Sequence, residues 1–105
     1  MNTIPTFILA HQNEVQGLCI DLAVSQLCLF GSALREDFNP DKSDLDFLVV
    51  FDSPDAPGIS DRYFSLAEGL EKIFHRPVDL ITKQSIKNRI FLDRVNSSSQ
   101  TLYAA

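Results

Sequence analysis

Blocks of apolar residues separated by polar ones predict strands and helices in turn along this chain. Short apolar runs without helical spacing predict strands at Leu27–Phe30, Phe47–Phe51 and Val78–Ile81, and an added edge strand at Thr101–Tyr103. The run Phe47–Phe51 has no polar alternation, which is typical of a strand covered on both faces. Four strands are therefore expected, one of them fully buried.

Other segments space their apolar residues three and four apart, as one face of a helix does. The clearest predicts a helix from about Ser60 to Phe74 that ends at His75-Arg76-Pro77, since a residue before proline is pushed out of the helical region. Residues 1–24 favour one helix with an apolar face, and residues from 83 favour another. The face residues are Ile8, Val15, Leu18, Cys19 and Leu22 in the first, and Ile86, Ile90, Phe91 and Val95 in the second.

This order of elements predicts an α/β (α+β) fold. We expect a small mixed β-sheet with helices mainly on one face. The other face, which would carry the carboxylates of Asp44, Asp46 and Asp79, is expected to be open. Residues 1–105 are expected to form a single domain, because a chain of this length has room for one core that buries roughly 60 to 65 per cent of its unfolded surface.

Composition and charge narrow the class of protein. The net charge is −5, and eight of the fourteen acidic residues fall between Glu36 and Asp61, where Lys42 is the only base. That field favours divalent cations and disfavours an extended nucleic-acid backbone, which needs a basic surface. No apolar run approaches the roughly 20 residues of a membrane span, and the start lacks signal-peptide features, so we expect a cytoplasmic protein.

Candidate chemistry concentrates between Leu27 and Asp52. The first strand stops at Gly31-Ser32, where glycine allows close backbone approach to a ligand and serine adds a hydroxyl. If a short helix follows, its N-terminal N–H groups would face a phosphate. Eleven residues later, Asp44 and Asp46 share one face of the second strand, and two carboxylates on one face can hold divalent metal.

A third acid, Asp79, interrupts the apolar strand Val78–Ile81. A charge there is costly unless it lies at an exposed end or meets a partner. It is either a third catalytic carboxylate beside Asp44 and Asp46 or one member of an ion pair with Arg76 or Lys83. Asp-x-Asp alone arises by chance in a chain with ten Asp residues. The informative feature is the combination of a strand, Gly-Ser, a polar connection, Asp-x-Asp, a second strand and a later Asp within an apolar strand. Cys19 and Cys28 lack metal-ligand or redox spacing and are expected to be reduced core residues.

The combination resembles the minimal nucleotidyltransferase (MNT) proteins of the DNA polymerase beta-like superfamily. Their pattern is Gly-Ser, about ten residues, Asp-x-Asp and a later Asp; here these are Gly31, Ser32, Asp44, Asp46 and Asp79. The resemblance covers nearly the whole chain. Two departures are Leu34-Arg35-Glu36 where many members have Ala-Arg-Gly, and a spacer of eleven residues.

The resemblance implies transfer of AMP from ATP by two magnesium ions. Asp44, Asp46 and Asp79 would be the catalytic, metal-binding carboxylates, with Asp79 beside the attacking hydroxyl. Gly31, Ser32 and Arg35 would bind the nucleotide, Gly31 and Ser32 at the β- and γ-phosphates.

The resemblance also implies an acceptor: a tyrosine hydroxyl of a HEPN-domain ribonuclease toxin, with this chain as its type VII-like antitoxin. Two alternatives stay open. In one, the site is inert and the protein neutralises or scaffolds its partner by contact alone, which the departures at Glu36 and in the spacer favour. In the other, an enzyme acts on a small acceptor only within a hetero-oligomer. Homo- and hetero-oligomers are both compatible with the sequence.

Overall fold

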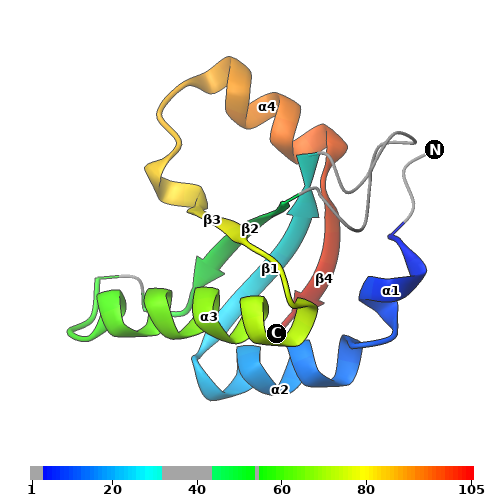
Figure 1. Ribbon diagram of the computed structural model, residues 1–105. Helices are drawn as coiled ribbons and strands as arrows, with labels where there is room; N and C mark the ends of the chain where they lie inside the picture. The colour runs from blue at the N-terminus through cyan, green and yellow to red at the C-terminus, as the bar shows by residue number, and fades with distance from the viewer. Residues whose placement is uncertain (1–3, 32–43, 54) are drawn as a thin grey trace.

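The computed structural model describes residues 4–31, 44–53 and 55–105, and its elements follow the predicted order (Figure 1). Its helices are α1 (Thr6–Leu9), α2 (Gln12–Asp21), α3 (Ile59–Phe74) and α4 (Arg89–Ser98), with a 3-10 turn, η2 (Lys83–Ser85). Its strands are β1 (Val24–Phe30), β2 (Leu45–Phe51), β3 (Val78–Thr82) and β4 (Gln100–Ala104). No helix in these ranges has both the length and the apolar character needed to cross a membrane.

The four strands form one mixed sheet in the order β3-β2-β1-β4. Strand β1 runs antiparallel to β2 and β4, whereas β2 and β3 are parallel. Parallel neighbours need a crossover, and α3 supplies it between β2 and β3. The prediction of a mixed sheet with the last strand at an edge is confirmed, and β3 forms the other edge.

The main core lies between one face of the sheet and helices α1 to α3. Phe47 and Val49 of β2 are fully buried against Leu66 and Leu70 of α3, and the rings of Phe47 and Phe74 stack at 6.1 Å. Cys19 belongs to the same core, and both cysteines are buried free thiols, as expected. The helices therefore lie mainly on one face, as predicted.

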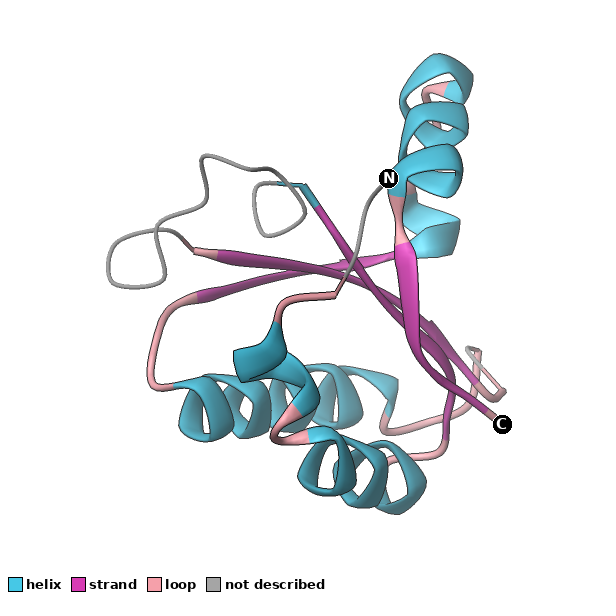
Figure 2. Ribbon diagram, turned by 90° about the vertical axis from the view of Figure 1, so that its right-hand side faces the viewer, coloured by secondary structure: helices cyan, strands magenta, loops and turns pink. Residues whose placement is uncertain are grey.

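The sequence had led us to expect that the opposite face of the sheet is open. This prediction is wrong. Helix α4 lies on that side of the sheet (Figure 2). Val95 packs there with Cys28, Phe30 and Leu48 in a second, smaller core. The sequence pattern missed this packing because Val95 is the single buried residue among the α4 side chains that the structure describes.

Two helical predictions were wrong at their boundaries. The N-terminal segment forms two helices, separated at Ala10 and His11, where the His11 ring packs edge-on against Phe74 and its Nδ1 lies 2.9 Å from Glu14 Oε1. Helix α4 begins after residue 86 because the Asn88 side chain accepts hydrogen bonds from the two N–H groups at residues 90 and 91, as an N-cap does. Tertiary contacts and capping decided both boundaries.

Candidate active site

The candidate site forms where β1 ends and β2 and β3 begin. In the sheet, Phe30 is opposite Asp46, and Asp46 is opposite Asp79. Residues in register on neighbouring strands are about 4.8 Å apart and point to the same face. The two carboxylates, 33 positions apart in the sequence, therefore lie side by side on the face that carries Leu48 and Ile81.

Gly31 lies directly against Asp46. Its φ is +77°, in the left-handed region that favours glycine. A Cβ added at Gly31 would overlap Oδ2 of Asp46 and lie 3.2 Å from its Cγ. The sequence predicted that this glycine permits close approach to a ligand; the structure shows that it also permits close approach of the Asp46 carboxylate.

Asp44 is an exposed residue immediately before β2. Strand alternation puts it on the same face as Asp46, two residues on. The backbone N–H of Leu45 donates to the carbonyl of Pro77 at 3.2 Å, which ties the start of β2 to the residue before β3. This contact holds the beginnings of the two acid-bearing strands at the same level.

The ion-pair alternative for Asp79 is not supported. Among the described residues no ion pair joins Asp79 to Arg76 or Lys83. Arg76 lies over the ring of Phe7, 5.0 Å from its centroid, and Phe7 packs against the main core. Asp79 instead occupies an exposed position beside Asp46.

The donor chemistry of this site fits magnesium. Mg²⁺ prefers oxygen ligands and is usually held by one or two carboxylates together with substrate phosphates. Within the described ranges no three Asp, Glu, His or Cys side chains gather closely enough to hold an ion by themselves. The partly exposed Asp46 and exposed Asp79 suit a site that is completed by a nucleotide. The predicted nucleotide-binding residues Ser32 and Arg35 lie outside the described residues.

Comparison with known proteins identifies this fold as that of a nucleotide-transferring domain. The family model for the nucleotidyltransferase domain matches residues 13–102. The chain belongs to this nucleotidyltransferase family.

A similar protein is the "Putative protein adenylyltransferase" of Methanocaldococcus jannaschii, 46% identical over 65 residues. The match covers 62% of this chain and 63% of that protein. This chain thus aligns with somewhat less than two thirds of the relative's length.

Solved structures share the fold. One described as a "putative minimal nucleotidyltransferase" is 24% identical, with a TM-score of 0.68 over 89% of this chain and 90% of that chain. Another is the tri-AMPylated Shewanella oneidensis HEPN toxin in complex with MNT antitoxin, in which the matching chain is 20% identical, with a TM-score of 0.60 over 92% of this chain and 72% of that one. The predicted family and fold class are confirmed.

Proposed function

We propose that this protein is a magnesium-dependent nucleotidyltransferase that moves AMP from ATP to a hydroxyl group. The observation that carries the proposal is the side-by-side placement of Asp46 and Asp79, with Gly31 packed against Asp46 at the end of β1. Membership of the nucleotidyltransferase family supports the same chemistry. The adenylyltransferase name of the archaeal relative supports AMP as the transferred group.

The three acids would bind metal, and Asp79 would in addition accept a proton. Asp44, Asp46 and Asp79 would hold two magnesium ions, which supply charge neutralisation at the attacking and leaving oxygens when bound. Asp79 sits on the outer strand, exposed, where an acceptor can reach it. As the acceptor oxygen bonds to the α-phosphorus, the bond to pyrophosphate breaks and the Asp79 carboxylate takes the hydroxyl proton.

The glycine turn would hold the rest of the nucleotide. The backbone at Gly31, without a Cβ, leaves room for the Asp46 carboxylate to lie against the turn. Its main chain would contact the phosphates. Ser32 would share the β- and γ-phosphates with Gly31, and Arg35 would add a further phosphate contact. Pyrophosphate would then leave on the side opposite the acceptor.

The acceptor we propose is a tyrosine hydroxyl of a HEPN-domain toxin, which would make this chain a type VII-like antitoxin of the cytoplasm. The fold likeness to the antitoxin chain in complex with an AMPylated HEPN toxin supports this choice of partner. Asp79 is exposed, and an exposed acid suits a macromolecular acceptor better than a small molecule that needs an enclosed site.

Labelled ATP, magnesium and the protein encoded beside this chain's gene, which the proposal expects to be a HEPN-domain toxin, test the proposal. We expect label on a tyrosine of that protein, and no label when Asp44 and Asp46 are both changed to Asn. Gly17→Ala is a suitable control because a Cβ there meets nothing within 4 Å. Absence of label from the HEPN protein with the unmodified chain would refute the transfer step.

The same double variant separates catalysis from binding. An inert binding module would neutralise the HEPN ribonuclease equally well with Asn at both positions. An enzyme would lose neutralisation along with transfer. Label that appears only on a small acceptor added to the purified complex would instead favour the hetero-oligomeric small-molecule enzyme.

A further inference from the structure

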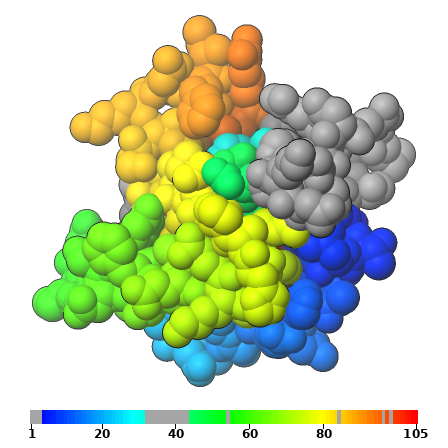
Figure 3. All heavy atoms as spheres, in the orientation of Figure 1, coloured from blue at the N-terminus to red at the C-terminus, as the bar shows by residue number. Residues whose placement is uncertain are grey.

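A groove follows the free edge of β3, next to the candidate site. It encloses about 490 Å³ between the first turns of α3 and the stretch from Leu80 to Ser85. Figure 3 shows these two segments as separate lobes on one side of the molecule with a hollow between them. We name it the β3 groove; its lining includes Ser60, Tyr63 and Phe64 from α3 and Ile81, Thr82 and Ser85 from β3 and η2.

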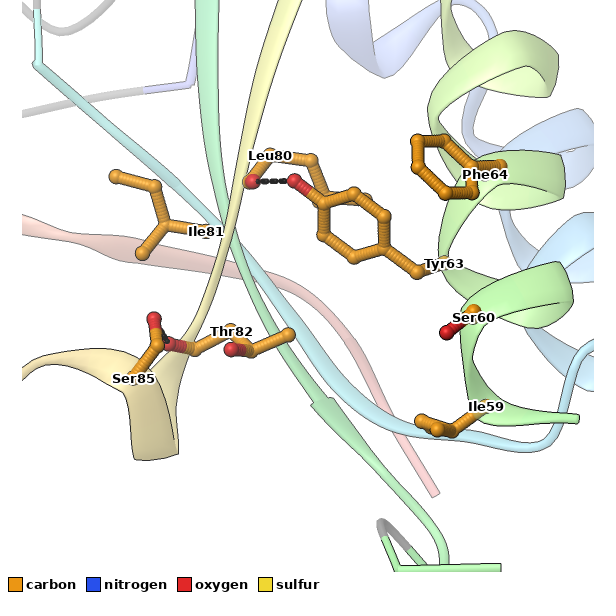
Figure 4. A pocket seen from close by; sticks show the side chains of 8 residues that line it. All are labelled: Ile59, Ser60, Tyr63, Phe64, Leu80, Ile81, Thr82 and Ser85. Carbon is orange, nitrogen blue, oxygen red and sulfur yellow. Dashed lines mark hydrogen bonds between the residues drawn. The ribbon is translucent and has the colours of Figure 1, made fainter. Parts of the chain in front are cut away.

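Two main-chain carbonyls on this edge, those of Leu80 and Thr82, already have partners. The hydroxyl of Tyr63 donates to the carbonyl of Leu80 (Figure 4), and Ser85 Oγ donates to the carbonyl of Thr82 at 2.8 Å. Residues two apart on a strand point their carbonyls the same way, so both carbonyls face the groove. An edge whose carbonyls are occupied is a poor template for an added strand. The groove is therefore suited to receive a side chain.

The lining selects an apolar or aromatic side chain. Its residues are aliphatic, aromatic or hydroxyl-bearing, and none carries a charge, although the chain as a whole is at −5. A phosphate group would find no cation among the lining residues that the structure describes. Phe64 has 62% of its surface exposed at the rim, packed edge-on against Tyr63 at 5.4 Å, and would be covered by an entering ligand.

One lining residue of the groove, Ile81, lies on the face of the sheet that carries the candidate catalytic acid. Figure 4 shows Ile81 on the side of β3 away from Tyr63. Strand alternation places Ile81 on the same face as Asp79, two residues or about 6.6 Å along the strand. An extended acceptor chain running beside β3 would cover that distance with about two residues.

We propose that the β3 groove is the acceptor subsite, which seats an apolar or aromatic side chain of the partner protein about two residues from the hydroxyl that is modified at Asp79. This inference rests on the proposed transfer of AMP to a protein. It adds a recognition site that is separate from the nucleotide and metal residues.

Two variants and one matched control test the subsite. Phe64→Ala removes the exposed rim, and Ser60→Arg fills the groove from an exposed position in the first turn of α3. The control, Phe91→Ala, removes another exposed phenylalanine, on α4, outside the groove. None of the three residues is buried, so the fold should persist in each variant.

The measurements are AMP transfer to, and binding of, the HEPN-domain protein encoded beside this chain's gene. Both groove variants should raise KM for that protein and its Kd by about tenfold or more, the size expected for an interface anchor. Their kcat and their KM for ATP should not change, and the control should behave as the unmodified chain. On complex formation, amide exchange should slow at residues 59–64 and 80–82.

Each other outcome is decisive. If the unmodified chain transfers AMP but the groove variants match it, or the control loses as much affinity as they do, the subsite is refuted and the proposed function stands. If the unmodified chain binds the HEPN protein without transferring AMP, the Kd values and amide exchange decide the docking site, while the transfer step fails. If it neither binds nor modifies that protein, both proposals fail.

Discussion

Replacement of Gly31 by alanine separates backbone strain from crowding of the Asp46 carboxylate. At φ +77° an alanine is strained by roughly 1–2 kcal/mol relative to glycine. In addition, the new Cβ would overlap Asp46 Oδ2, so the carboxylate has to move. We expect Gly31→Ala to lower both stability and transfer activity.

Gly58 provides the matched control. Its φ is +87°, similar to that of Gly31, but a Cβ added there meets no atom of the described residues within 4 Å. Gly58→Ala should therefore carry the same backbone strain without moving a carboxylate. In a domain of this size each kcal/mol lowers Tm by about 4–8 °C, so both variants should unfold at measurably lower temperature.

Activity distinguishes the two variants. Misplacing a catalytic group by about 1 Å can cost on the order of 10²-fold in rate, and we expect a loss of this size for Gly31→Ala alone. The assays are thermal unfolding and AMP transfer at a temperature where both variants are folded. Equal activity of the two variants, with equal losses of Tm, would show that the approach of Gly31 to Asp46 does not matter for function.

Three further predictions concern stability. Gly17→Ala should stabilise α2 by about 0.5–1 kcal/mol, because helical glycine is unfavourable and a Cβ there meets no described atom within 4 Å. Gly69→Ala should destabilise the protein, because its Cβ would lie 2.6 Å from Leu18 Cδ2. Urea unfolding measures both changes in the free energy of unfolding, and changes of the same sign would contradict the packing. Burial raises the pKa of Cys19 to about 12, against 9.0 for a free thiol. Because the folded state favours the neutral thiol, stability is fully present below pH 9 and should fall by up to about 4 kcal/mol as pH approaches 12, a loss that Cys19→Ala would abolish in pH-dependent unfolding. Tyr63→Phe should cost about 1 kcal/mol through the lost hydrogen bond to the β3 carbonyl, and an unchanged urea midpoint would refute that contribution.

Local pattern predicted the elements well where one periodicity dominates. The α3 helix was expected from about Ser60 to Phe74 and runs Ile59–Phe74, because its apolar residues recur on a single face. Strand β2 was recognisable for a similar reason, since an uninterrupted apolar run suits a central strand. The predicted helix boundaries were wrong where side-chain contacts decided them, namely those of His11 and the N-cap of Asn88.

Local pattern likewise predicted some features of the candidate site and missed others. Residue type and spacing in the sequence singled out Gly31, Asp44, Asp46 and Asp79 as candidate site residues and, by resemblance, indicated the family. No local signal pointed to the β3 groove, and the sequence pattern did not single out Phe64. A large exposed apolar residue is the feature that would have drawn attention to it.

The sequence by itself determined which segments form strands and helices and which side chains are candidates to bind metal or phosphate, because these depend on neighbours within a few residues. Only the tertiary structure decided that Asp79 lies beside Asp46, that Gly31 touches the Asp46 carboxylate, and that a groove opens along β3. Each of these depends on which strands pair and in what register. Strand pairing joins residues far apart along the chain, and one residue of slip in register would turn the side chains of a strand to its other face.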